Sequence, residues 1–201
     1  MSVDTTDEPS NGRGEEPPVA ALWQRIESWL AAHAPEARAA LRPAVTAEAV
    51  EQVERTLGAE LPQDFRESLR IHDGQTSFPV FARWKLLSCS SILERWKLQL
   101  RISRELGLES TPGRPEGPVR GVWWDALWVP IATDGAGNDL CLDLHPPAAG
   151  KRGQLIEYVH DDEGRPVVST SFRAWLRGFV DDLEAGRYDV DDFSGFPVEK
   201  A

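Results

Sequence analysis

The densest group of residues that could bind a metal ion lies between residues 134 and 143. Four side chains with oxygen ligands follow one another there: Asp134, Asn138, Asp139 and Asp143. Ca²⁺ prefers such ligands, but the EF-hand pattern of alternating acids and a closing Glu is absent. Gly135 and Gly137 instead permit a tight turn, whose backbone donors Asp134 and Asn138 can satisfy. We therefore predict a structural turn here and no metal site.

No other set of reactive residues has the spacing of a catalytic motif. The histidines are scattered, at positions 33, 72, 145 and 160, and the sequence contains no Cys-x-x-Cys. It also lacks the Gly-x-Ser-x-Gly nucleophile elbow and the Gly-x-x-x-x-Gly-Lys-Ser/Thr phosphate loop. His72 beside Asp73 could be a base and its orienting group, or both could be turn residues, which we favour. We predict a protein that is not an enzyme and needs no cofactor.

Tryptophans offer a different kind of chemistry, because aromatic side chains are enriched where proteins bind one another. Trp123 and Trp124 follow a long loop at 109–121 that is rich in Pro and Gly, so this pair is a candidate exposed surface. Trp128 lies inside a predicted strand and is expected in the core.

A concentration of carboxylates near the C-terminus is the second candidate binding surface. It consists of Asp181, Asp182, Glu184, Asp189, Asp191 and Asp192. Acids at the end of a helix oppose its dipole by about 0.3 kcal/mol or more each, so their presence suggests a use such as docking a cationic surface. A merely solvated acidic end is the alternative. The candidate partner-binding residues are Trp123, Trp124, Asp134, Asn138, Asp181, Asp182, Asp189, Asp191 and Asp192.

The spacing of apolar residues predicts the elements that position these groups. Helices are expected near 18–33, 46–58, 62–69, 88–106 and 171–186, and strands at 126–132, 139–144 and 154–160. Helices come first, then a strand meander, then a closing helix. This order is typical of an α+β fold, with a mixed or antiparallel sheet of about four to six strands and helices packed around it.

Charge and composition limit the classes of partner that the protein is expected to bind. The 201 residues include 22 basic and 33 acidic side chains, a formal charge of −11. This balance disfavours nucleic acid and anionic membranes and favours a basic protein partner, unless it serves only solubility. No apolar run approaches the ~20 residues of a membrane span. We expect a disordered acidic tail at 1–18 that is no Sec signal, one domain at 19–188, an acidic tail at 189–201, and a cytoplasmic location.

A set of short segments occurs in a characteristic order. It includes Leu61, Pro62 and Phe65; His72, Asp73 and Gly74; Trp128, Pro130 and Ile131; Asp134, Gly135, Gly137 and Asn138; Asp143; Gly153; and Ser171, Phe172, Trp175 and Leu176. Over roughly residues 20 to 187 the chain resembles the SUKH superfamily, the SMI/KNR-type domain. It departs from that pattern with His-Asp-Gly in place of Asn-Gly, and with an aromatic-basic stretch and a long loop between residues 76 and 125.

The resemblance implies an SMI/KNR-like α+β binding domain inside the cell. Its structural motif residues would be Trp128, Pro130, Gly135, Gly137 and Asp143. Bacterial members often neutralise a toxin, and fungal members regulate cell-wall assembly. Our first hypothesis is therefore an immunity-type protein, with a cationic toxin domain as its protein partner. The alternative is a regulatory or scaffold protein of the cell-wall or stress-signalling type. The oligomeric state is open.

Overall fold

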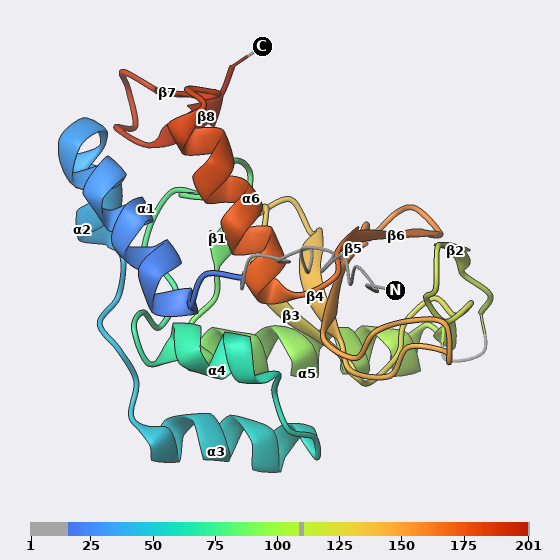
Figure 1. The fold of residues 1–201 in the computed structure, drawn as a ribbon. Helices are drawn as coiled ribbons and strands as arrows, with labels where there is room; N and C mark the ends of the chain where they lie inside the picture. The colour runs from blue at the N-terminus through green and yellow to red at the C-terminus, as the bar shows by residue number, and fades with distance from the viewer. Residues whose placement is uncertain (1–15, 109–110, 201) are drawn as a thin grey trace, which may run out of the picture.

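The structure, a computed structural model, describes residues 16–108 and 111–200. Its helices are α1 Val19–His33, α2 Pro35–Ala40, α3 Ala47–Leu57, α4 Gln63–Leu69, α5 Cys89–Glu105 and α6 Phe172–Glu184. Its strands are β1 Lys85–Leu86, β2 Arg114–Glu116, β3 Trp128–Thr133, β4 Asp139–Asp143, β5 Gln154–Tyr158, β6 Gly164–Ser169, β7 Tyr188–Val190 and β8 Pro197–Glu199. The helices lie around a central sheet (Figure 1), which confirms the expected α+β fold. Residues 1–15 of the expected N-terminal tail lie outside the described part.

The central sheet is mixed and has the strand order β1-β3-β4-β5-β6-β2. All neighbouring strands are antiparallel except β6 and β2, which run parallel. β3 and β4 pair directly on either side of the 134–138 turn, as the sequence predicts, with Thr133 opposite Asp139. The register of this pair shifts after Pro130, a residue without the N–H that a regular ladder needs.

Three helices are capped by hydroxyl residues. Thr46 is the candidate for α3 in the sequence, which leaves Ser88, Ser90 or Ser91 open for α5 and Ser169, Thr170 or Ser171 open for α6. The side chains of Thr46, Ser88 and Ser171 accept hydrogen bonds from backbone N–H groups three residues further on. Each satisfies a donor that the first helical turn leaves free. The beginnings of α3, α5 and α6 are thus fixed by local sequence. None of the helices in the part of the chain described combines the length and apolar character needed to cross a membrane.

The sheet has a buried core on each face, because alternate strand residues point to opposite sides. Val129, Leu140 and Leu155 face the larger core, which α1, α4 and α6 complete. Trp128, Cys141, Ile156 and Tyr158 face a smaller core, to which the C-terminal half of α5 contributes Trp96 and Leu100. Part of the central sheet is therefore covered by α6 on the face of the larger core and by α5 on the face of the smaller core.

Charged side chains are buried on the face of the smaller core. The Asp139 carboxylate accepts from Arg95 Nε, at 2.8 and 2.9 Å, and from the Gln99 side chain at 2.9 Å. Arg165 has no exposed surface and donates to backbone oxygens, including Trp123 O at 2.9 Å and Asp162 O at 2.6 Å. Its guanidinium also lies over the Tyr158 ring, 4.5 Å from the centroid. These bonds join α5 to β4 and the 123 loop to β6.

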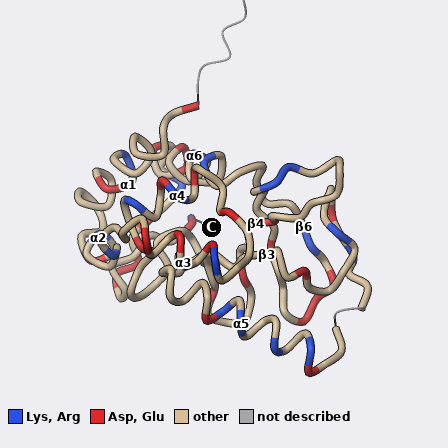
Figure 2. Tube along the Cα trace, turned by 90° about the horizontal axis from the view of Figure 1, so that it is seen from below, with Lys and Arg blue, Asp and Glu red and all other residues tan. Residues whose placement is uncertain are grey.

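The segment expected as an acidic C-terminal tail forms a hairpin of β7 and β8 as far as residue 199. Phe196 is buried and contacts the Phe78 ring, with centroids 5.6 Å apart. Tyr188 is also buried, against Phe179 of α6. The aromatic residues anchor the hairpin, while its acids face outward. Figure 2 shows acidic and basic positions mixed over most of the molecule, with several Lys and Arg positions along the C-terminal part of α5.

Candidate protein-binding surface

An open groove of about 320 Å³ lies where α6, β6, the β7–β8 hairpin and the 81–84 turn meet. We call it the aromatic groove. Its lining includes Phe81, Trp84, Trp175, Phe179 and Tyr188. The Phe81 ring is 4.6 Å from Phe179 and 5.0 Å from Trp175, centroid to centroid. Interlocked rings of this kind give a groove a floor that keeps its shape.

Two exposed apolar side chains border the aromatic groove. Val168 of β6 is 42% exposed and Val198 of β8 is 43% exposed, and neither is covered within the described chain. Val168 lines the groove itself, while Val198 lines a second hollow that shares Ala82, Trp84 and Glu199 with it. The apolar surface therefore continues from the groove across β8.

The 81–84 turn contains an unusual backbone conformation. Ala82 has a φ of 52° and is the one residue other than glycine with a positive φ in the described ranges. Trp84 N donates to Phe81 O at 2.8 Å, which closes the turn around it. Arg83 then lies over the Trp84 ring at 4.7 Å and pairs with Glu157 at 2.6 Å. Strain of this kind tends to occur at functional positions, and here it shapes the wall of the groove.

The rim of the aromatic groove carries carboxylates. Asp182 is paired with Arg187, whose Nε lies 2.6 Å away. Glu199 lies between the groove and the second hollow and forms no ion pair with any described residue. The arrangement offers one unsatisfied negative charge beside aromatic rings, an environment that suits a cationic side chain.

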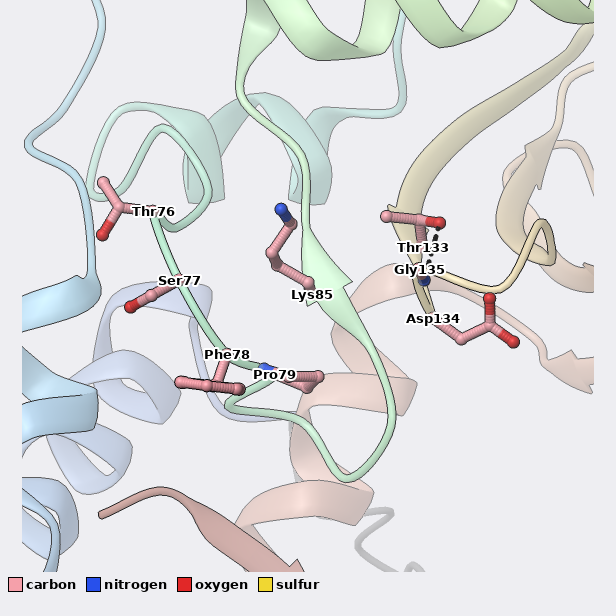
Figure 3. A pocket seen from close by; sticks show the side chains of 8 residues that line it. All are labelled: Thr76, Ser77, Phe78, Pro79, Lys85, Thr133, Asp134 and Gly135. Carbon is pink, nitrogen blue, oxygen red and sulfur yellow. Dashed lines mark hydrogen bonds between the residues drawn. The ribbon is translucent and has the colours of Figure 1, made fainter. Parts of the chain in front are cut away.

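A separate hollow of about 370 Å³ lies on the other side of the 76–85 segment. Figure 3 shows the Lys85 side chain between Thr76–Pro79 and the turn at Thr133–Gly135. Phe78, 53% exposed, and Pro79 supply its apolar wall. Lys85 makes no ion pair within the described residues, so this hollow has a positive side chain where the groove has a negative one.

The 133–138 turn, predicted as architecture, is held by its own side chains. Asp134 accepts from Ala136 N at 2.8 Å and from the Asn138 side chain at 2.6 Å. Burial opposes ionisation of Asp134, but these hydrogen bonds outweigh it and lower the pKa. Gly137 has a φ of 113°, and a Cβ there would come within 3.0 Å of the His160 ring. Both candidate binding residues of this turn thus use their polar groups to hold its shape.

The two candidate tryptophans lie in different environments. Trp124 is buried in the smaller core, with its ring 5.0 Å from Tyr158 and 5.9 Å from Trp128. Trp123 is partly exposed and lies under the guanidinium of Arg165. Trp128 has no exposed surface, in agreement with its expected place in the core. Of the pair, only Trp123 offers its ring to solvent.

The candidate aspartates near the C-terminus are largely paired with basic neighbours. Asp181 lies 3.6 Å from Arg177 and 3.9 Å from Arg25, and Asp189 lies 3.2 Å from Lys200. The Ser194 side chain, and then the Ser194 N–H from which Asp191 accepts at 2.7 Å, lower the pKa of Asp191 within the hairpin turn. Asp192 is exposed. The acidic end therefore has less free charge than its composition suggests.

The structure does not gather the predicted binding residues into one place. Asp182 lines the aromatic groove, Asp134 lines the Lys85 hollow, and Trp124 lines a third groove beside α5. Apart from the aromatic-basic stretch around Trp84, no pattern in the sequence indicates that the groove residues come together. Among the described residues, no group of three or more His, Cys, Asp or Glu side chains is placed to hold a metal ion.

Comparison with known sequences shows that the chain is similar to fungal proteins named as regulators. The model of the SMI1/KNR4 family, SUKH-1, matches residues 44–178. "Cell wall biosynthesis/cell cycle regulator smi1" of Schizosaccharomyces pombe is 30% identical over 92% of this chain and 40% of its own length. "Glucan synthesis regulatory protein" of Neurospora crassa is 28% identical, over 90% and 41%. "Cell wall assembly regulator SMI1" of Saccharomyces cerevisiae is 26% identical, over 86% and 43%.

The chain spans about two fifths of the length of these relatives. The family match covers the segment from α3 into α6, which includes the central sheet and the 76–85 segment. The resemblance seen in the short segments is thereby confirmed. This chain belongs to the SMI1/KNR4 family, SUKH-1.

Proposed function

We propose that this chain is a regulatory domain of cell-wall assembly that acts by binding another protein. The relatives named above are regulators of cell-wall biosynthesis, assembly and glucan synthesis, which supports the alternative hypothesis from the sequence. A toxin-neutralising role has no support among them. A cytoplasmic location is part of the proposal, and imaging of a tagged protein tests it.

The aromatic groove is the observation that carries the binding role. Aromatic side chains surrounded by exposed apolar groups are typical of binding hot spots. Val168 and Val198 are both more than two fifths exposed. A partner that covers them gains the free energy of removing that apolar surface from water.

The partner's segment has a chemistry that the groove defines. An apolar side chain fits between Trp84 and Trp175, and a neighbouring Lys or Arg meets the free carboxylate of Glu199. The net charge of −11 attracts the same kind of segment from a distance. We therefore propose a short apolar segment with a basic flank as the ligand.

A chimera tests both parts of the proposal. The matching segment of the Neurospora crassa relative is replaced by this chain, and glucan synthesis is measured in cells that lack the original protein. We expect the chimera to restore synthesis. V168E together with V198E places carboxylates on the exposed border of the groove and should abolish the restoration, because a partner would have to bury them.

The matched control is A20E together with A39E, which adds the same charge at exposed positions on α1 and α2. Circular dichroism checks that all variants fold. Failure of the unaltered chimera would contradict the cell-wall role. Full restoration by the groove variant would contradict the assignment of the groove while leaving the role in place.

A further inference from the structure

A basic stretch interrupts this acidic chain. Residues 95–104 contain three Arg and one Lys and no Asp or Glu, although the whole chain has a charge of −11. Arg95 forms an ion pair with Asp139. The other three are Lys97, Arg101 and Arg104, which are all exposed on α5. Spacings of four and three residues place them on one face of the helix.

A groove runs beside this face. It measures about 400 Å³ and lies between α5 and the 120–127 segment. Leu100, Trp124 and Leu127 supply apolar lining. Leu106, just past the end of α5, is 68% exposed. The C-terminal half of α5 projects beyond α3, so α3 does not cover this region (Figure 1).

The far side of the groove is also basic. Arg120 and His145 both line it, together with Asp125. The Asp125 carboxylate is already used: it lies 3.2 Å from Arg120 Nε and 3.1 Å from His145 Nδ1, and it accepts from Leu127 N at 2.8 Å. Arg120 and Asp125 thus neutralise each other on the far side, and the positive charge that has no ion pair among the described residues lies beside the groove, at Lys97 and Arg101 of α5.

We propose that this cationic groove binds an acidic amphipathic segment of a partner protein. Apolar side chains of the segment would contact Leu100 and Leu127, while its carboxylates would face Lys97 and Arg101. Nucleic acid and anionic membranes fit less well, because a long polyanion meets the negative charge of the rest of the molecule. A short acidic segment can be confined to Lys97 and Arg101, between the exposed Glu94 and Glu105 of α5. This site is separate from the aromatic groove and takes a ligand of the opposite charge.

The test uses a fluorescein-labelled peptide of about 16 residues, with leucines at helical spacing and glutamates between them. Binding to the whole chain is followed by fluorescence anisotropy. K97E together with R101E should weaken the affinity about tenfold or more, because attraction becomes repulsion. A126E, at an exposed position that lines the groove, should also weaken it.

R38E together with R55E is the matched control, since it changes the net charge equally at exposed positions on α2 and α3. Its affinity should fall far less than that of the α5 variant. A peptide of the same composition with scrambled leucines should bind more weakly. The proposal is overturned by absent binding, by equal losses in both double variants, or by equally tight binding of phosphatidylserine vesicles or single-stranded DNA.

Discussion

Asp143 is fully buried although it is charged in water at neutral pH. It accepts hydrogen bonds from His145 N and from the Gln154 side chain, both at 3.0 Å. Burial is the largest influence and raises its pKa, and the bond from His145 only partly offsets it. A motif residue of the family pattern thus connects β4 to β5 at an electrostatic cost.

Replacing Asp143 by Asn should reveal this cost as a pH dependence. When the pKa of a carboxyl group is higher in the folded protein than in the unfolded chain, the group contributes to the free energy of unfolding below the unfolded pKa of about 3.9. This contribution is lost as the pH rises through the raised pKa of the folded protein. The wild type should therefore exceed D143N in free energy of unfolding by more at about pH 4 than at about pH 7. Urea denaturation at both values measures this.

D134N is the control, for which the stability difference from the wild type should change with pH in the opposite direction. The pKa of Asp134 is lowered, so its contribution is present above the ordinary value and lost as the pH falls. The advantage of the wild type over D134N should shrink on acidification. Equal pH trends for the two variants would refute the assignment of the two environments.

Ala82 shows strain at the scale of one residue. A left-handed conformation costs a residue with a side chain about 1–2 kcal/mol, and glycine avoids it while adding about 0.5–1 kcal/mol of unfolded-state entropy. A82G should leave the free energy of unfolding unchanged or raise it by up to about 1 kcal/mol in urea denaturation. A82V, which keeps the strain and adds bulk, should destabilise. A clear loss of stability in A82G would contradict this expectation. It would mean that packing of the Ala82 methyl group contributes more free energy than the backbone strain of the turn costs.

At the scale of elements, local signals predicted the helices well and the short strands poorly. The caps of α3, α5 and α6 are encoded by hydroxyl residues next to apolar stripes, so neighbours in sequence determine them. β1 and β2 are two and three residues long and lie at the sheet edges. For β1 the mixed aromatic and basic stretch at 78–87 indicates a short strand, whereas β2 lies in the 109–121 segment, where the sequence predicts a loop, and it forms a strand because β6 lies beside it.

The C-terminal hairpin is an element that composition alone misrepresents. F196A removes the buried ring that contacts Phe78, and it should lower the free energy of unfolding by about 2–4 kcal/mol, since large-to-small changes in cores cost about this much. Hydrogen exchange should become faster at the amides of residues 188–199. F193A is the control, because Phe193 is 92% exposed, and it should have almost no effect. Equal effects of the two changes would contradict a docked hairpin.

At the scale of the whole molecule, the net charge and the local patches act separately. The field of an acidic protein speeds the approach of basic ligands and falls off with salt. A labelled peptide with leucine flanked by arginines should associate several-fold more slowly at about 200 mM NaCl than at about 20 mM in stopped-flow measurements. The acidic peptide for the α5 groove should show a weaker salt dependence, because local attraction and net repulsion oppose each other.

The double variant R38E and R55E provides the control for this charge effect. It takes the formal charge from −11 to −15, four units lower, without touching either groove. At low salt this double variant should increase the association rate of the basic peptide. An association rate that is independent of both salt and this change would show that the charge of −11 serves only solubility.

The sequence by itself determined the cap of α3, the β3–β4 turn and the short segments of the family pattern, and it limited the caps of α5 and α6 to three hydroxyl residues each, because each of these features depends on residues close together in the chain. Only the tertiary structure brought the 81–84 turn beside α6 and β8, paired Arg95 with Asp139, and placed Arg120 and His145 in one groove with Leu100 of α5. These contacts join segments that are tens of residues apart. Their free energy comes from burial and charge pairing in the folded chain, and spacing along the sequence carries no trace of them.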